Sequence, residues 1–234
     1  MLHCELRGRV LTLTIDRPPV NAIDGNLASE LRRALAGVVD RPEVGAVVLT
    51  GAGDRAFSAG QDLRSFAASA THDPDPGRVP REMLEAIRRC PVPVVAAMNG
   101  PAVGGGVSLL SMCDIIVAVR ESWIQTPEIE VGLLGAYRHL VALVGDRRAR
   151  HLYLTAERCP VDQLLASGAV ARLVDRSELA GVAAKMAAEL AAKDPMTMRL
   201  AKQMIDVTES LLPLEAYRVE QVFTARRRAM RDDR

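Results

Sequence analysis

A carboxylate in an apolar segment and two groups of glycines could perform chemistry in this 234-residue sequence. The carboxylate is Glu128, in TPEIEVGLLG (residues 126–135), where burial would raise its pKa toward a value useful for proton transfer. A solvated glutamate is the simpler interpretation of Glu128 taken alone. Glu130 is a rival, because nothing in this segment fixes which of the two side chains faces inward.

The first glycine-bearing segment is GAGDRAFSAGQDL (residues 51–63), directly after a predicted buried strand. Open α/β sheets bind ligands at the carboxyl ends of their strands. Ala59 and Gly60 are small, so a ligand could approach the main chain, and the N–H of Gln61 would be free to donate. Taken alone, the segment is explained slightly better as an ordinary turn.

In the second segment, Gly104 to Gly106 precede an apolar helix within NGPAVGGGVSLLSMC (residues 99–113). Amides at a helix N-terminus are unsatisfied and favour an anion or a developing oxyanion. The spacing of a dinucleotide fingerprint is absent, no Gly-Lys-Ser/Thr follows, and Ser108 does not stand in G-x-S-x-G. Close packing of a helix on a sheet is an equally good interpretation of these glycines alone.

The elements that must position these residues alternate between strands and helices. Strands are predicted at 2–6, 9–15, 45–50, 92–100 and 114–120, and a helix carrying Leu27, Leu31, Leu35 and Val38 should be capped by Asp24. Residues 79–90 and the segment after the glycines should also be helical. This repetition favours stacked ββα turns of a spiral, with a doubly wound sheet as the alternative.

Behind this α/β region the sequence becomes largely helical. Helices are predicted at 136–144, 146–154, 160–167, 176–193, 195–209 and 213–231, with a short strand near 169–174. Residues 66–80, rich in proline, small and polar residues, are predicted to form a loop. We therefore divide the chain into a core at 1–175 and a C-terminal helical region at 176–234.

Composition excludes several classes of partner. The net charge is +1 and aromatic residues make up 3%, which argues against nucleic acid and membrane surfaces. The four cysteines form no C-x-x-C pair and have no histidine cluster beside them, so no metal site is expected. No signal peptide or membrane span is recognisable, which predicts a cytoplasmic protein.

Taken together, the order and spacing of five segments resemble the enoyl-CoA hydratase/isomerase (crotonase) superfamily from about residue 2 to residue 225. The segments are RPPVNAID, AFSAGQDL, NGPAVGGG, CDIIVA and PEIEVGLLG. The resemblance implies the crotonase spiral of ββα turns, with C-terminal helices that form a homotrimer or a hexamer (dimer of trimers). It also implies an acyl-CoA thioester substrate and no cofactor beyond the CoA of that substrate.

The resemblance also assigns roles to residues of this chain. The thioester oxygen should accept hydrogen bonds from the N–H groups of Gln61 and Gly105. The catalytic residues are expected to be Glu128, Gln61, Gly105 and Ser108, and the CoA moiety is expected to contact Ala22, Ala59, Gln61, Asp62, Leu63 and Gly105.

The family's two catalytic glutamates would fall at Ser108 and Glu128, so the chain departs from the two-glutamate pattern at Ser108. A serine cannot act as a general base near neutral pH without a partner, although it can hold a water or a hydroxyl. We therefore expect a hydratase-like lyase that uses Glu128 alone. The alternatives are a Δ3,Δ2-enoyl-CoA isomerase and a catalytically silent acyl-CoA-binding protein.

Three further branches of the family compare differently with this chain. A Ser-plus-Glu pair at these positions resembles the hydroxycinnamoyl-CoA hydratase-lyases. The dienoyl-CoA isomerase and hydroxyacyl-CoA hydrolase branches carry an acidic residue eight positions beyond the Glu128 site, where this chain has Ala136.

Overall fold

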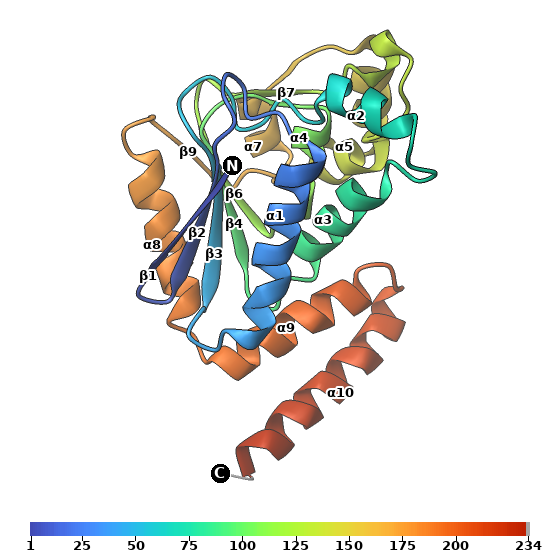
Figure 1. Cartoon of the computed structure of the whole chain (residues 1–234). Helices are drawn as coiled ribbons and strands as arrows, with labels where there is room; N and C mark the ends of the chain where they lie inside the picture. The colour runs from blue at the N-terminus through green and yellow to red at the C-terminus, as the bar shows by residue number, and fades with distance from the viewer. Residues whose placement is uncertain (233–234) are drawn as a thin grey trace.

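The structure is a computed structural model that describes residues 1–232. A sheet in the order β1-β2-β3-β4-β6-β9 forms its centre (Figure 1). β1 and β2 are antiparallel, joined at Gly8, whose φ of +57° suits a residue without a Cβ. The later pairs are parallel. The strands are β1 (Leu2–Arg7), β2 (Val10–Ile15), β3 (Ala46–Gly51), β4 (Val94–Met98), β6 (Ile115–Val119) and β9 (Arg172–Val174).

A second, smaller sheet lies beyond the ends of the large sheet and joins successive ββα turns of the spiral. Its order is β5-β7-β8, from β5 (Ala102–Val103), β7 (Trp123–Gln125) and β8 (Cys159–Pro160). Single bridges, Ile23 with Gln61 and Ser58 with Ala102, extend this contact to two earlier loops. The first three turns thus run from a long strand through a short extended segment into a helix, as the predicted spiral requires.

Helices cover both faces of the large sheet because successive residues of its parallel strands point to opposite faces. One face packs against α1 (Gly25–Ala36), α3 (Arg78–Arg88) and α4 (Gly105–Met112), and the other against α8 (Leu179–Ala191). Asp24 caps α1 as predicted, because its carboxylate accepts a hydrogen bond from the Leu27 N–H at 2.8 Å. The helix ends at Ala36, and Val38 belongs to the 3-10 turn η1 (Gly37–Asp40).

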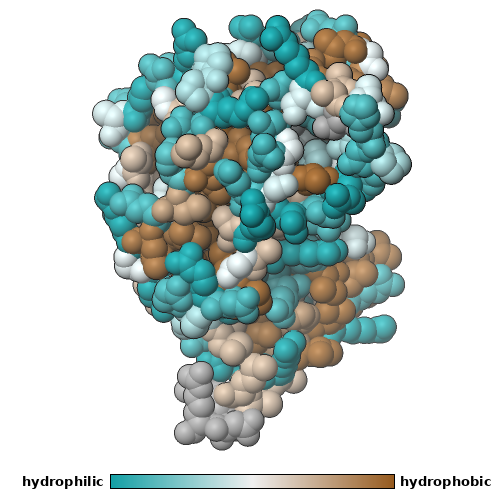
Figure 2. All heavy atoms as spheres, in the orientation of Figure 1, coloured by the Kyte–Doolittle hydropathy of each residue, from teal (hydrophilic) through white to brown (hydrophobic). Residues whose placement is uncertain are grey.

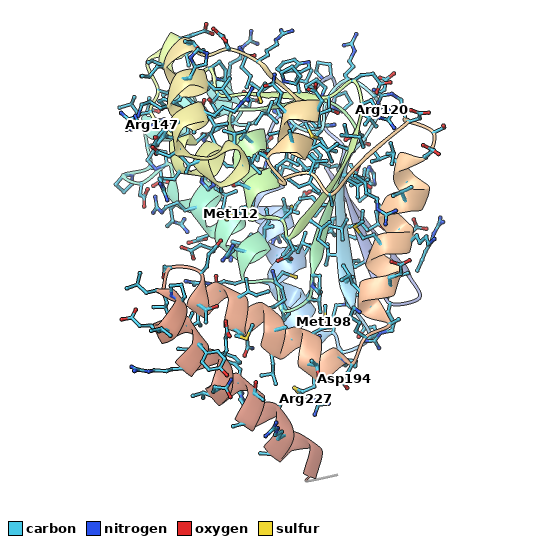
Figure 3. The ribbon with its side chains drawn as sticks, turned by 180° about the vertical axis from the view of Figure 1, so that it is seen from behind. Met112, Arg120, Arg147, Asp194, Met198 and Arg227 are labelled. Atoms are coloured by element: carbon cyan, nitrogen blue, oxygen red, sulfur yellow. The ribbon has the colours of Figure 1, made fainter. Side chains whose placement is uncertain are left out.

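The remaining helices follow the predicted ranges closely. They are α5 (Tyr137–Val144), α6 (Asp146–Thr155), α7 (Val161–Ala166), α9 (Pro195–Thr208) and α10 (Pro213–Asp232). α10 projects from the body alongside α9 (Figure 1), and Arg227 of α10 donates to Asp194 at the start of α9 at 3.0 Å (Figure 3). Exposed apolar side chains gather on this pair of helices and the turn between them (Figure 2), among them Ile205, Leu212, Leu214 and Val222. Trimerisation through this region stays a prediction.

The predicted loop at 66–80 is wrong at both of its ends, and residues 78–80 already belong to α3. Residues 66–70 belong to α2 (Leu63–Ala70), and irregular chain covers residues 71–77 before α3 begins. The carboxylate of Asp62 accepts from the N–H groups of Arg64 and Ser65, which stabilises the start of α2. No helix among the described residues is long and apolar enough to span a membrane.

Candidate active site

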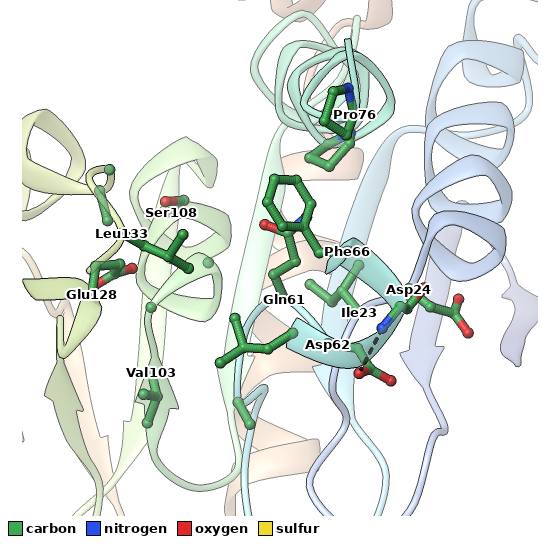
Figure 4. A pocket seen from close by; sticks show the side chains of 18 of the residues that line it. Ile23, Asp24, Gln61, Asp62, Phe66, Pro76, Val103, Ser108, Glu128 and Leu133 are labelled. Carbon is green, nitrogen blue, oxygen red and sulfur yellow. Dashed lines mark hydrogen bonds between the residues drawn. The ribbon is translucent and has the colours of Figure 1, made fainter. Parts of the chain in front are cut away.

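A cavity of about 500 Å³ opens between α2, α3, α4 and the 3-10 turn η2 (Glu128–Val131). This volume is in the range of small-molecule binding sites. Figure 4 shows Ser108, Glu128 and Leu133 along one wall, Phe66 and Pro76 along the facing wall, and Gln61 between them. The cavity therefore joins segments that are distant in the sequence.

Two main-chain amides meet in this cavity. The bridge between Ile23 and Gln61 uses the carbonyl of Gly60 and the N–H of Asp62, which leaves the Gln61 N–H without an acceptor among the described residues. The N–H of Gly105, the first residue of α4, likewise has no acceptor among them. A Cβ on Gly105 would lie 3.3 Å from the Gln61 nitrogen, so the two amides are close neighbours.

Glycine is required where these amides meet. Gly60 has a φ of +77°, and a Cβ there would lie 2.6 Å from the Gly105 nitrogen and 2.5 Å from the Val103 oxygen. Neither backbone atom can yield without moving the N-terminus of α4. The pair of free N–H groups therefore depends on the absence of a side chain at Gly60.

The carboxyl of Glu128 projects into the cavity from η2. A Cβ on Gly104 would lie 3.0 Å from its Oε1, so the missing side chain of Gly104 makes room for this group. Its Oε2 is buried and has no hydrogen-bond partner in the described chain. Burial raises the pKa of Glu128 above its usual value. Glu130, the rival in sequence, is exposed and does not line the cavity.

Ser108 lies one turn into α4, buried beside this carboxylate-bearing wall. Behind it, Ser111 donates to the Ser108 carbonyl at 2.8 Å and lies 2.8 Å from Nδ1 of His139. Burial lowers the pKa of His139. These hydrogen bonds tie α5 to α4, and neither Ser111 nor His139 lines the cavity.

Arg17 clamps the two loops that support the Gln61 amide. Its Nη2 lies 2.6 Å from Oδ2 of Asp62, its Nε lies 3.2 Å from Oδ2 of Asp24, and its Nη1 donates to the Ala22 carbonyl at 3.2 Å. The hydrogen bond from Arg17 holds the pKa of Asp62 below its usual value. One guanidinium thus joins the chain on both sides of the Ile23–Gln61 bridge.

The structure gathers the predicted site residues into one place. Ala59, Gln61, Asp62, Leu63, Gly105, Ser108 and Glu128 line the cavity, whereas Ala22 lies beside it and contributes its carbonyl to the Arg17 clamp. Their roles stay predictions. Sequence reasoning missed the clamp, the space made by Gly104 and the apolar wall of α3, although Arg17 stands in the segment RPPVNAID.

Comparison with known proteins decides the family. The model of the enoyl-CoA hydratase/isomerase family matches residues 5–227. The chain belongs to this family. The family acts on CoA thioesters, and the predicted crotonase fold is confirmed by solved structures. An enoyl-CoA hydratase from Bacillus anthracis superposes with a TM-score of 0.89 at 27% identity, covering 96% of this chain and 89% of that one.

Relatives within the family carry different activities. A Rhodococcus jostii protein described as a (7aS)-7a-methyl-1,5-dioxo-2,3,5,6,7,7a-hexahydro-1H-indene-carboxyl-CoA hydrolase is 37% identical over 92% of this chain and 84% of its own length. Carnitinyl-CoA dehydratase from Escherichia coli is 31% identical over 93% of this chain and 84% of its own length. DspI from Pseudomonas aeruginosa superposes with a TM-score of 0.86 at 34% identity, covering 95% of this chain and 88% of that one.

Proposed function

We propose that the protein is an enoyl-CoA hydratase-like lyase that uses Glu128 as its single acid/base. The observation that carries this proposal is the convergence of the free Gln61 and Gly105 amides with the unpaired Glu128 carboxyl in one cavity. The thioester oxygen would accept hydrogen bonds from both amides, which stabilise negative charge as an enolate forms. One donor of this kind contributes roughly 2.7–4 kcal/mol in comparable sites.

Glu128 would move the protons. In its ionised form it takes a proton from water as the oxygen attacks C3, and the neutral carboxyl then gives a proton to C2. A raised pKa suits both steps, because the group must accept and release a proton in one cycle. Ser108 would hold the water or the product hydroxyl, and we propose that no cofactor takes part besides the CoA of the substrate.

Isomerisation is the second candidate, and Ser108 is the observation that favours it. Moving a proton between C2 and C4 requires one carboxylate and no positioned water. The indene-carboxyl-CoA hydrolase relative adds hydrolysis as a third outcome to measure.

Turnover assays with matched glutamate variants test the proposal. Crotonyl-CoA and an aromatic enoyl-CoA are supplied and loss of enoyl absorbance is followed, with 3-enoyl-CoA in parallel. Glu128→Gln should lower kcat by about 10²–10⁴-fold. Glu130→Gln is the matched control, because the same change two residues away falls outside the cavity and should leave kcat unchanged.

Each outcome separates the candidates. Hydration lost in Glu128→Gln supports the lyase, and conjugated product from 3-enoyl-CoA without hydration selects the isomerase. Tight CoA-thioester binding with no exchange of the C2 proton in deuterated water would identify a silent binding protein. Turnover unchanged in Glu128→Gln would overturn the role given to this residue.

We further propose that the protein works as a homotrimer or a dimer of trimers in the cytoplasm. The apolar side chains exposed on α9 and α10 support this assembly, because their burial between subunits would remove them from water. Light scattering after size exclusion, with and without α10, measures the subunit number.

A further inference from the structure

We propose that the site takes acyl groups without charge and discriminates against acyl-CoA thioesters whose acyl chain ends in a second carboxylate. This inference rests on the proposed CoA-thioester site and concerns which acyl chain that site accepts. It follows from the charges and the apolar walls around the cavity.

The charged residues that line the cavity are all acidic. They are Asp24, Asp62, Asp73 and Glu128, and no Lys, Arg or His of the described chain lines it. Asp24 and Asp62 are compensated by Arg17. Asp73 and Glu128 have no cation within ion-pair distance in the described structure, so the cavity favours neutral or positive groups over negative ones.

The arginines of α3 near the cavity are already engaged. Arg78 pairs with Glu82 at 3.0 Å, and Arg81 pairs with Asp75 at 2.5 Å. Neither guanidinium lines the cavity. A carboxylate at the end of an acyl chain would therefore compete with Glu82 or Asp75 for either of these two guanidinium groups.

The walls beyond Gln61 are apolar. Phe66 of α2 and Val79, Met83 and Leu84 of α3 form one side, and Leu133 lies opposite. Leu134, whose exposed fraction is 87%, stands at the opening. Hydrocarbon of an acyl chain would cover these surfaces, whereas a carboxylate would lose its water there without gaining a partner.

A matched set of eight-carbon thioesters tests the inference. Calorimetry measures the binding of octanoyl-CoA, 8-hydroxyoctanoyl-CoA and suberyl-CoA to the full-length protein. The acyl chains of the first two carry no charge, so the hydroxy thioester separates the effect of charge from that of polarity. Suberyl-CoA should bind at least about tenfold more weakly than 8-hydroxyoctanoyl-CoA. Equal affinity of these two would overturn the inference.

A substitution at the opening gives a second readout. Leu134→Arg places a cation there and should reduce the ratio of the affinities for 8-hydroxyoctanoyl-CoA and suberyl-CoA at least about threefold. The matched Leu134→Gln should leave this ratio unchanged. An unchanged difference in Leu134→Arg would overturn the placement of the acyl end along this wall. Saturated thioesters need no turnover, so the result does not depend on the catalytic role proposed for Glu128. Failure of octanoyl-CoA to bind would instead count against the proposed thioester site itself.

Discussion

Replacing Gly60 by alanine should damage both the fold and the site, and the size of the effect follows from the geometry. At a φ of +77° an L-residue costs about 1–2 kcal/mol. The new Cβ would also lie 2.5 Å from the Val103 oxygen and 2.6 Å from the Gly105 nitrogen. Overpacking of this kind costs typically about 1–3 kcal/mol. The free energy of unfolding should therefore fall by about 2–5 kcal/mol.

Gly53→Ala is the matched control for this prediction. Gly53 has a φ of +72°, and a Cβ there meets no atom within 4 Å. Gly53→Ala should therefore lower the free energy of unfolding only by the conformational cost, about 1–2 kcal/mol. Urea unfolding followed by circular dichroism gives both values, and their difference isolates the contacts at Gly60.

The same pair of variants tests the amides. If Gly60→Ala pushes the Gly105 N–H out of reach, kcat should fall by about 10²–10³-fold, as for a lost oxyanion donor. The absorption of bound para-dimethylaminocinnamoyl-CoA, which shifts to longer wavelength as its carbonyl is polarised, should shift less in this variant than in Gly53→Ala. Equal unfolding free energies, or a Gly60→Ala protein with the wild-type kcat and absorption shift, would refute the reasoning.

Three further substitutions give expected outcomes. Because the pKa of Glu128 is raised in the folded state, this carboxyl stays protonated over a pH range in which the unfolded chain has already lost the proton. The contribution of Glu128 therefore lowers the free energy of unfolding as pH rises through that range. Glu128→Gln should therefore resist urea better than wild type near neutral pH and lose this advantage below about pH 4. Arg17→Gln should lower kcat by roughly tenfold to hundredfold with little change in KM, because it releases Asp62 and with it the Gln61 loop; a proportional rise in KM instead would contradict this. Asp114→Ala should cost about 3 kcal/mol in urea unfolding, because it leaves the buried ammonium of Lys202 without the carboxylate 2.6 Å away, whereas Lys202→Met should cost less; the reverse order would be inconsistent with this account.

Much of the fold could be predicted because its long elements carry strong patterns. The alternation in Val10–Ile15 and the apolar run at residues 46–49 of β3 each match the burial that the structure shows. β5 and β8 span two residues each, too few for any period to be visible. The whole of α2 was missed because the proline-rich segment after Ala70 led the predicted loop to begin too early, although Asp62 is a suitable cap.

The site could be predicted in part. The glycines indicated where main-chain amides could be reached, because such amides need small neighbours, and the family resemblance assigned the donors to Gln61 and Gly105. The segment alone could not decide between Glu128 and Glu130, because a single 3-10 turn orients them and a four-residue element leaves no periodic pattern; only the family resemblance pointed to Glu128. The role of Arg17 was also hidden, since its two carboxylate partners are 7 and 45 residues away along the chain.

The two free N–H groups belong to the main chain, and this affects how the protein can change over generations. No single codon change deletes a backbone amide, except one that introduces proline. Side chains of the proposed acyl walls could therefore be exchanged while the amides proposed to face the thioester oxygen are inherited intact. A lineage built this way could move to new acyl chains by substitution in α2, α3 and the segment after η2, and a few glycines would be among its vulnerable positions although they contribute no side chain.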